Sequence, residues 1–195
     1  MNKKIIQSFK KILFLGYGKN ETMLINFLEN KGCKITHSSD MNFDFQDFDL
    51  IISFGFRHII KKDVIEKAPP IINLHISFLP FNRGAHPNFW AHFDKTPSGV
   101  TIHLIDKGID TGDYLFREEL FFEVESMTFR QSHDILISSI ENLFIKNYES
   151  IINLDLKPHK YLENGTHHLS KDLPKDFLGW DSNIHSEITR LKLKA

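Results

Sequence analysis

The chain has 195 residues, 41% of them hydrophobic and 25% charged, as in an ordinary globular protein with one domain. Its net charge of −1 at pH 7 argues against a nucleic-acid-binding surface spread over the whole domain. The single cysteine, Cys33, excludes an internal disulfide and an all-cysteine zinc site.

The N-terminal segment does not read as a secretion signal. Its apolar run is short and is broken by Lys10, Lys11 and Gly16, and no small-residue cleavage site follows. No stretch of the chain approaches the roughly 20 apolar residues of a membrane span. We therefore expect a cytoplasmic protein without a membrane or nucleic-acid partner.

Apolar runs and helical patterns alternate along the first half of the chain. Strands are predicted over residues 11–18, 34–38, 49–55 and 69–75. Helices are predicted over 21–30, with Asn20 as N-cap and Gly32 as stop, and over 61–68. This alternation predicts an α/β fold with a mostly parallel, twisted sheet and helices on both faces.

After Trp90 the pattern changes. Residues 99–106 and 114–124 are strand-like and are joined by a glycine-rich turn. The pair Thr128 and Gln131 has the spacing of a capping box and opens the longest predicted helix, over 129–153. Its apolar stripe is Leu136, Ile140, Leu143 and Phe144. A short helix is predicted near 186–193.

Two polar side chains lie inside the predicted strand 69–75. Asn73 and His75 are two residues apart and therefore share one face of the strand. In α/β sheets ligands bind beyond the carboxyl ends of the strands. An amide and an imidazole at such a place suit a reaction in which negative charge develops on a carbonyl oxygen. On this pattern alone, a structural histidine is the alternative.

An acidic turn follows the strand 99–106. It contains Asp106, Asp110 and Asp113 together with two glycines, so that backbone and carboxylate can approach a bound molecule closely. An aspartate beside His75 would orient the imidazole and favour its charged form. A solvated loop is the alternative.

Metal sites are poorly supported. Residues 106–113 lack the spaced ligands and the terminal glutamate of a calcium loop. A zinc site through His75, His86 and Asp110 matches no usual ligand spacing. We expect no metal.

Two motifs in this order resemble the folate-dependent formyltransferase family. NLHISFLPFNRG (73–84) matches the pattern N-x-H-x-S-x-L-P-x-x-R-G, and GVTIHLIDKGIDTGD (99–113) matches G-V-T-I-H-x-x-D-x-G-x-D-T-G-D. Two long motifs in order are more specific than one short motif. The resemblance implies a Rossmann-like formyltransferase fold, with a catalytic domain over 1–155. A C-terminal extension over 156–195 would pack on the core or at a subunit contact.

The resemblance also implies an activity, in which 10-formyltetrahydrofolate donates a formyl group to a primary amine. Asn73, His75 and Asp110 match the catalytic residues of the family. Asn73 and a protonated His75 would donate hydrogen bonds to the oxyanion, and Asp110 would hold the imidazolium and help to manage the amine proton.

Further residues are implied by the same resemblance. The cofactor-site candidates are Phe56, Arg57, His58, Ile59, Asp106 and Ile109. The substrate-site candidates are Leu74, Ile76, Ser77, Arg83, Gly84 and Asn88. Asn88 belongs to a loop, 86–92, that contacts sugar or base or simply packs against the sheet.

The amine acceptor is open among three branches. The methionyl-tRNA branch carries a further C-terminal domain. Only residues 156–195 follow the predicted catalytic domain here, so we do not expect that acceptor. The glycinamide ribonucleotide branch has a glycine-rich loop that 16–22 matches only in part. The segments 53–60 and 165–173 look most like the nucleotide-sugar branch. We therefore expect a nucleotide-linked amino-deoxy sugar, such as dTDP-4-amino-4,6-dideoxyglucose, as used in lipopolysaccharide O-antigen synthesis.

Two other classes stay open. A folate-binding module that has lost catalysis would not need all three matching polar residues. A nicotinamide-dependent dehydrogenase is weaker, because no full G-x-G-x-x-G follows the first strand. A homodimer is left open, and the tail 174–195 either packs on the core, with Trp180 as its anchor, or builds a subunit contact.

Overall fold

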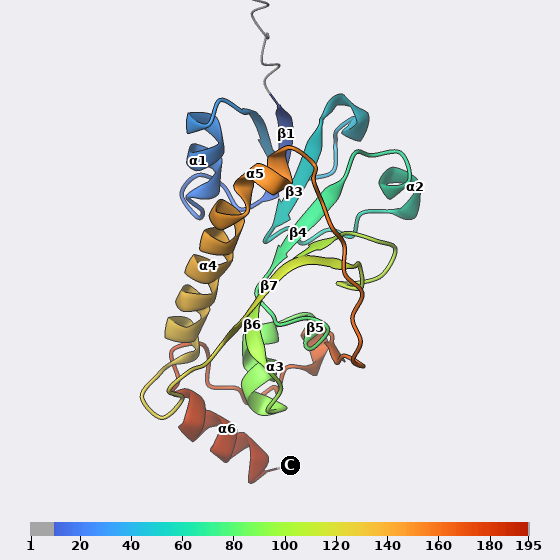
Figure 1. Ribbon diagram of the computed structural model, residues 1–195. Helices are drawn as coiled ribbons and strands as arrows, with labels where there is room; N and C mark the ends of the chain where they lie inside the picture. Colours follow the sequence, from blue (N-terminus) through green and yellow to red (C-terminus); the bar gives the residue numbers. More distant parts are fainter. Residues whose placement is uncertain (1–9, 195) are drawn as a thin grey trace, which may run out of the picture. The chain divides into compact units, whose positions relative to one another are not determined.

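The structure is a computed structural model that describes residues 10–194 (Figure 1). The start of the segment considered above as a secretion signal, residues 1–9, lies outside the described residues. The chain divides into two compact units, Met1–Ile72 and Asn73–Ala195. Residues 156–194 belong to the second unit, and the domain boundary expected after residue 155 stays a prediction.

Six strands are hydrogen-bonded in the order β2-β1-β3-β4-β6-β7. Strand β4 (Ile71–His75) begins in the first unit and ends in the second. β1 runs parallel to β2 and β3, whereas β7 runs antiparallel to β6. The predicted α/β class with a mostly parallel sheet is confirmed. Among the described residues, no helix has both the length and the apolar character to cross a membrane.

The first unit is built on the apolar runs that the sequence analysis assigned to strands. Its elements are β1 (Lys11–Gly16), α1 (Leu24–Asn30), β2 (Lys34–Ser38), η1 (Phe45–Asp47), β3 (Leu50–Phe54) and α2 (Lys62–Ile65). The interior residues of β1 and all of β3 are buried. Such continuous apolar runs are typical of central strands in parallel sheets.

Helix α1 begins later than predicted, at Leu24 rather than near residue 21, and Asn20 is not its N-cap. Residues 18–22 form a turn instead, in which the Glu21 and Thr22 N–H groups both donate to the Gly18 carbonyl. The Glu21 carboxylate in turn accepts a hydrogen bond from the Gly18 N–H, at 3.0 Å. This local turn takes up the residues that the prediction gave to the first helical turn.

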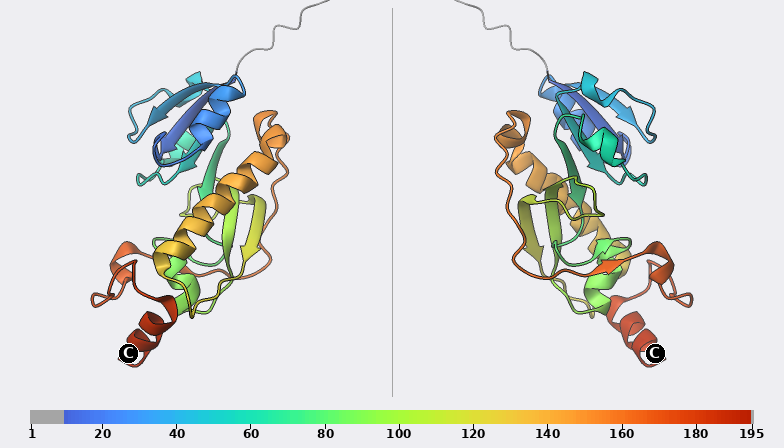
Figure 2. Two further views of the ribbon diagram at one scale, coloured as in Figure 1. Left: turned by 90° about the vertical axis from the view of Figure 1, so that its left-hand side faces the viewer. Right: turned by 90° about the vertical axis from the view of Figure 1, so that its right-hand side faces the viewer.

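The second unit contains the remaining strands and the longest helix. After β4 its elements are β5 (Arg83–Gly84), α3 (Pro87–Phe93), β6 (Ser98–Leu104), β7 (Tyr114–Leu120), α4 (Phe129–Lys146), α5 (Tyr148–Ile152), β8 (His167–His168), η2 (Ser170–Asp172) and α6 (Ile184–Lys192). Helix α4 packs along β6 and β7, as both side views show (Figure 2).

Helix α4 opens as predicted and ends earlier. The capping box of Thr128 and Gln131 is present, and the predicted apolar stripe is buried. The single helix predicted over 129–153 was wrong in one respect, because Asn147 separates α4 from α5. The Asn147 side chain donates to the Leu143 carbonyl at 2.8 Å, which satisfies a carbonyl at the end of α4.

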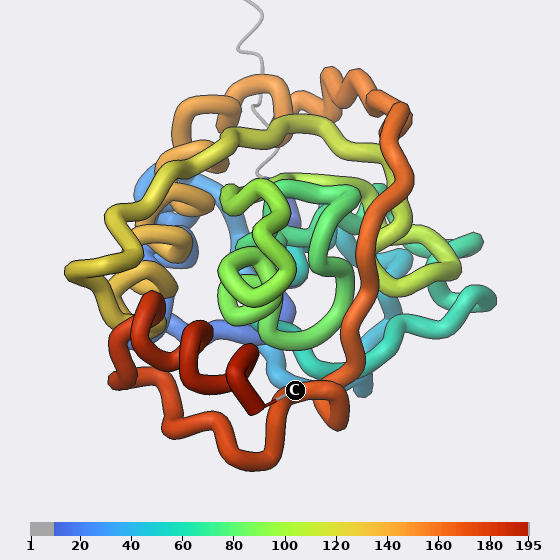
Figure 3. Tube along the Cα trace, turned by 90° about the horizontal axis from the view of Figure 1, so that it is seen from below, coloured from blue at the N-terminus to red at the C-terminus, as the bar shows by residue number. Residues whose placement is uncertain are grey.

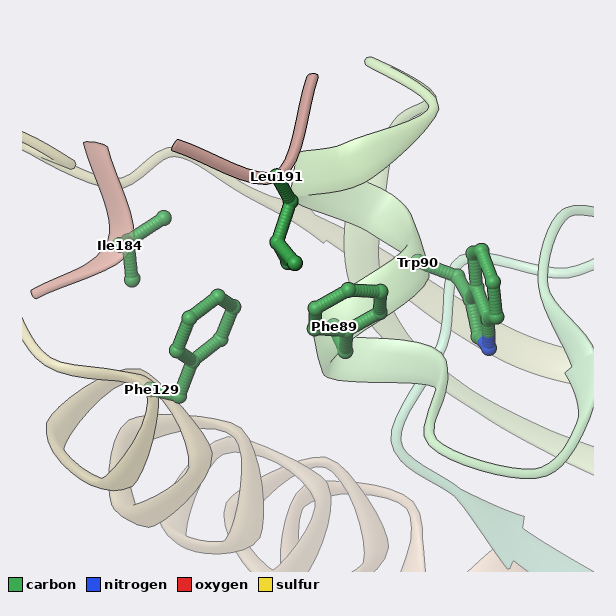
Figure 4. Packing of buried hydrophobic residues seen from close by; sticks show 5 residues of the cluster. All are labelled: Phe89, Trp90, Phe129, Ile184 and Leu191. Carbon is green, nitrogen blue, oxygen red and sulfur yellow. The ribbon is translucent and has the colours of Figure 1, made fainter. Parts of the chain in front are cut away.

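The tail of the chain packs on the core of the second unit. Phe89 of α3 stacks on Phe129 of α4, with ring centroids 5.6 Å apart. Ile184 and Leu191 of α6 complete this buried cluster together with Trp90 (Figure 4). Trp180 packs against the cluster, so its predicted role as an anchor is confirmed. Helix α3 itself was missed, since its residues were read as a loop.

The segment between α5 and β8 runs along the outside of the second unit and returns to β5 (Figures 1 and 3). β5 and β8 pair in parallel, with Arg83 opposite His167 and Gly84 opposite His168. The C-terminal segment therefore meets the chain at the last two residues of the first long motif, 73–84.

Candidate active site

The end of strand β4 supplies two of the predicted side chains. Asn73 is partly buried, His75 is buried, and Leu74 between them is buried as well. The Asn73 side chain points its amide nitrogen toward Asp110, with 3.3 Å between Nδ2 and Oδ1. The Nε2 atom of His75 lies 3.7 Å from Asp110 Oδ2. The sheet thus brings together three side chains from two separate motifs.

Asp110 stands on the loop between β6 and β7 in a left-handed backbone conformation, with φ of 51°. Aspartate tolerates this region better than most residues. Its Oδ2 atom accepts a hydrogen bond from the Gly84 N–H at 2.9 Å. Both carboxylate oxygens are therefore held by donors from the first motif, one by Asn73 and one by Gly84.

A second histidine, His103 of β6, completes the group and was missed from the sequence. Its Nε2 atom lies 3.5 Å from Asp110 Oδ1 and 3.2 Å from Asn73 Nδ2. Its Nδ1–H donates to the Leu104 carbonyl at 2.8 Å. Nε2 of His103 therefore lies between the Asp110 carboxylate and the Asn73 amide. The signal was present, because His103 is a polar residue inside an apolar strand.

The charge states of the site differ from the expectation. Burial lowers the pKa of His75, and the neighbouring His103 acts in the same direction. Asp110 and a hydrogen bond with the Asn82 backbone oppose this effect but do not overcome it. The expected charged form of His75 is thus corrected to a neutral imidazole near pH 7.

Asp110 is ionised. Burial by itself would raise the pKa of this carboxyl group, but attraction to His75 and the hydrogen bonds from His103 and Gly84 hold it well below its usual value. The site therefore combines a carboxylate with a neutral ring whose Nε2 has no hydrogen-bond partner among the described residues.

The predicted cofactor residues lie in both units and are described separately. In the first unit, Phe56 and His58 follow β3, and their ring centroids are 5.3 Å apart. Arg57 lies between them, and Ile59 is 75% exposed. In the second unit, Asp106 Oδ1 accepts from Gly108 N at 2.9 Å and from Thr111 Oγ1 at 2.6 Å. Ile109, beside Asp110, is 42% exposed. Their contact with a folate stays a prediction.

The substrate-site candidates separate by burial. Arg83, Gly84 and Ile76 are partly exposed, whereas Leu74, Ser77 and Asn88 are buried. The Ser77 hydroxyl donates to the Phe81 carbonyl at 2.7 Å. The Asn88 amide donates to the Phe129 carbonyl at 2.9 Å and its oxygen accepts from Ser132 at 3.1 Å. These hydrogen bonds inside the protein use both polar atoms of the Asn88 side chain.

Within residues 10–194, no group of three or more histidine, cysteine or acidic side chains could hold a metal ion. The alternative zinc site through His75, His86 and Asp110 therefore has no support among the described residues.

Comparison with known proteins assigns the family. Residues 12–128 match the family model described as Formyl transferase. The chain is 35% identical to the formyltransferase PseJ from Anoxybacillus kamchatkensis, with a TM-score of 0.82 over 90% of this chain and 96% of that one. The PseJ crystal contains UDP-4,6-dideoxy-4-formamido-L-AltNAc and tetrahydrofolate.

Two further similarities bear on fold and length. A 4-N formyltransferase from Francisella tularensis has the same fold, with a TM-score of 0.74 and 19% identity over 92% of this chain and 86% of that one. The methionyl-tRNA formyltransferase of Clostridium botulinum is 36% identical over 143 residues, which are 71% of this chain and 45% of that protein. The chain thus spans about half the length of such relatives. The resemblance noted in the two motifs is confirmed, and the chain belongs to the formyltransferase family.

Proposed function

We propose that this protein transfers a formyl group from 10-formyltetrahydrofolate to the amino group of a nucleotide-linked amino-deoxy sugar. The convergence of Asn73, His75 and Asp110 carries the proposal of formyl transfer. The likeness to PseJ, over 90% of this chain, supports both the folate donor and an acceptor of this class. It favours a UDP-linked 4-amino-4,6-dideoxy sugar over the dTDP-linked sugar expected from the sequence.

The first role concerns charge on the formyl oxygen. When the amine nitrogen bonds to the formyl carbon, negative charge develops on that oxygen. Asn73 can supply a neutral donor, because its Nδ2 carries two hydrogens and the hydrogen bond to Asp110 Oδ1, at 3.3 Å, uses one of them. One well-placed donor of this kind contributes roughly 3–4 kcal/mol to a reaction barrier.

The second role concerns the proton of the attacking amine. His75 is neutral and its Nε2 has no hydrogen-bond partner among residues 10–194, so this atom can accept the proton. The resulting imidazolium faces Asp110 Oδ2 at 3.7 Å, and the pair is then oppositely charged. The step closes when the bond between the formyl carbon and N10 of the folate breaks and N10 takes the proton held by His75, which returns the ring to its neutral form. The products are a formamide and tetrahydrofolate.

A transfer assay with a panel of amines tests the proposal. The panel contains a UDP-linked and a dTDP-linked 4-amino-4,6-dideoxy sugar, glycinamide ribonucleotide and methionyl-tRNA, and mass spectrometry detects the formylated product. We expect formylation of a nucleotide sugar, and loss of most turnover in Asn73→Ala and His75→Ala. Activity confined to glycinamide ribonucleotide or methionyl-tRNA would refute the acceptor class.

Methionyl-tRNA is the second candidate acceptor. The observation in its favour is that sequence relatives with 31–41% identity are methionyl-tRNA formyltransferases. PseJ has similar identity over a much larger share of its own length, 96% against 45%. The same panel separates the two, because formylmethionyl-tRNA and a formylated sugar nucleotide differ in mass and in ribonuclease sensitivity.

A further inference from the structure

We propose that Thr166, in the C-terminal segment, is a positioning residue for catalysis, acting through Asn82 on both His75 and Asp110. This inference rests on the proposed formyl transfer. It gives the segment 165–168 a part in the reaction, although none of its side chains is among the reacting groups described above.

The first step is the way Thr166 holds Asn82. The Thr166 hydroxyl accepts a hydrogen bond from the Asn82 N–H at 2.8 Å and donates one to Asn82 Oδ1 at 3.1 Å. The Asn82 amide also donates to Thr96 Oγ1 at 2.8 Å. Asn82 is completely buried and has a left-handed backbone, with φ of 55°. Asparagine is among the few residues that tolerate this conformation.

The second step is the pairing of backbones around this residue. The Arg83 N–H donates to the Thr166 carbonyl at 3.0 Å, and the Ala85 N–H donates to the His168 carbonyl at 2.9 Å. The two chains also approach very closely. A Cβ atom on Gly165 would lie 1.9 Å from the Pro80 carbonyl oxygen. The segment 165–168 therefore fixes the backbone of residues 82–85 from one side.

The third step links this backbone to the site. The Gly84 N–H, within the fixed segment, donates to Asp110 Oδ2 at 2.9 Å. The Asn82 backbone also raises the pKa of His75, which places it beside the imidazole. One short stretch of backbone thus holds the carboxylate directly and borders the imidazole. Thr96 and Thr166 both hold this stretch at Asn82 from outside the motif, and Thr166 is the one that accepts from the Asn82 backbone N–H.

Catalytic groups need to be held to within a fraction of an ångström. Without the Thr166 hydroxyl, the buried Asn82 N–H loses its acceptor and Asn82 Oδ1 loses one donor. The stretch can then shift, and His75 and Asp110 shift with it. Displacements of about 1 Å are known to reduce rates by about 100-fold.

The test compares two substitutions of one residue. Thr166→Val keeps the shape of the side chain and removes the hydroxyl, whereas Thr166→Ser keeps the hydroxyl. Thr128→Val is the matched control, because it removes a hydroxyl that also accepts from a backbone N–H, that of Gln131 at 3.2 Å. Each variant is assayed for kcat, for KM of the amine acceptor and for the amide NMR signal of Gly84.

We expect kcat of Thr166→Val to fall by about 10- to 100-fold, with little change in KM, and the Gly84 amide signal to move. Thr166→Ser should restore both to near the wild-type values, and Thr128→Val should leave both unchanged. Equal losses in the valine and serine variants, or an unmoved Gly84 signal in Thr166→Val, would overturn the inference. A wild-type protein that formylates no amine would refute the proposed function instead, and the Gly84 signal would still test the support of Asp110.

Discussion

His92 provides a quantitative test of how burial controls the stability of the second unit. Its ring lies near Phe122 and Phe129, at centroid distances of 5.7 and 6.0 Å. Its Nε2 atom is buried and has no hydrogen-bond partner in the part of the chain that the structure describes. This burial lowers the pKa of His92 from 6.5 to about 4. Between these pH values the unfolded chain binds a proton at His92 that the native protein does not bind. The free energy of unfolding must therefore fall as the pH falls.

The magnitude follows from the two pKa values. A group with a pKa of 6.5 in the unfolded chain and about 4 in the native protein removes about 3 kcal/mol of stability between pH 7 and pH 4. His92→Phe eliminates this loss because phenylalanine does not titrate. It should also keep or raise the stability at pH 7, since it removes a buried nitrogen that lacks a partner.

Urea unfolding followed by tryptophan fluorescence, at pH values from 7 down to 4, measures the effect. The difference in unfolding free energy between His92→Phe and the wild type should grow by about 3 kcal/mol over this range. The variant His92→Gln is a second non-titrating control, which retains a polar side chain. If both variants lose stability in parallel with the wild type, the buried neutral state of His92 is refuted.

Three other predictions concern the site. Asp110→Asn should reduce turnover by about 10²–10⁴-fold and stability by about 1–3 kcal/mol in urea unfolding, because an amide cannot accept from both Asn73 and Gly84. The acid limb of kcat/KM should lie below pH 6.5, since burial lowers the pKa of His75; a limb above 6.5 in the pH–rate profile would contradict this. Gly165→Ala should lower both the melting temperature and kcat, because its Cβ would come within 1.9 Å of a backbone oxygen; an unchanged melting temperature would count against that close approach.

The six strands of the larger sheet were predictable from sequence, mostly as apolar runs with a glycine, proline or polar residue at the end. The two-residue strands β5 and β8 have no such pattern and were not predicted. Helix boundaries were less predictable. The periodicity of 129–153 continues through Asn147, so that only the hydrogen bond of its side chain to Leu143 reveals the break. Helix α3 was missed although Pro87 occupies the first helical turn, a position that proline favours. Its residues were read as a loop that contacts sugar or base or packs against the sheet, and in the fold Phe89 and Trp90 are part of the buried cluster.

The site was predictable to the extent that it lies within continuous motifs. Asn73, His75 and Asp110 stand at recognisable positions in two such stretches. His103 was hidden because it was read only as part of a strand. The contact between Asn82 and Thr166 joins residues 84 positions apart, and no local pattern encodes such a pair. Support of this kind becomes visible only when the chain is folded.

The charges of the site fit the order of events in the proposed reaction. An amine is largely protonated in neutral water, so the acceptor first meets the site as a cation. An ionised Asp110 beside a neutral His75 gives the pair one negative charge, which attracts that cation. The cation releases one proton to water before it attacks, and the neutral ring accepts the proton that the nitrogen carries once it is bonded to the formyl carbon. The imidazolium so formed is stabilised by the carboxylate 3.7 Å away. Had burial left His75 charged, the pair would be neutral overall and the ring would have no free site for a proton. The low pKa of His75 is thus a requirement of this reaction order.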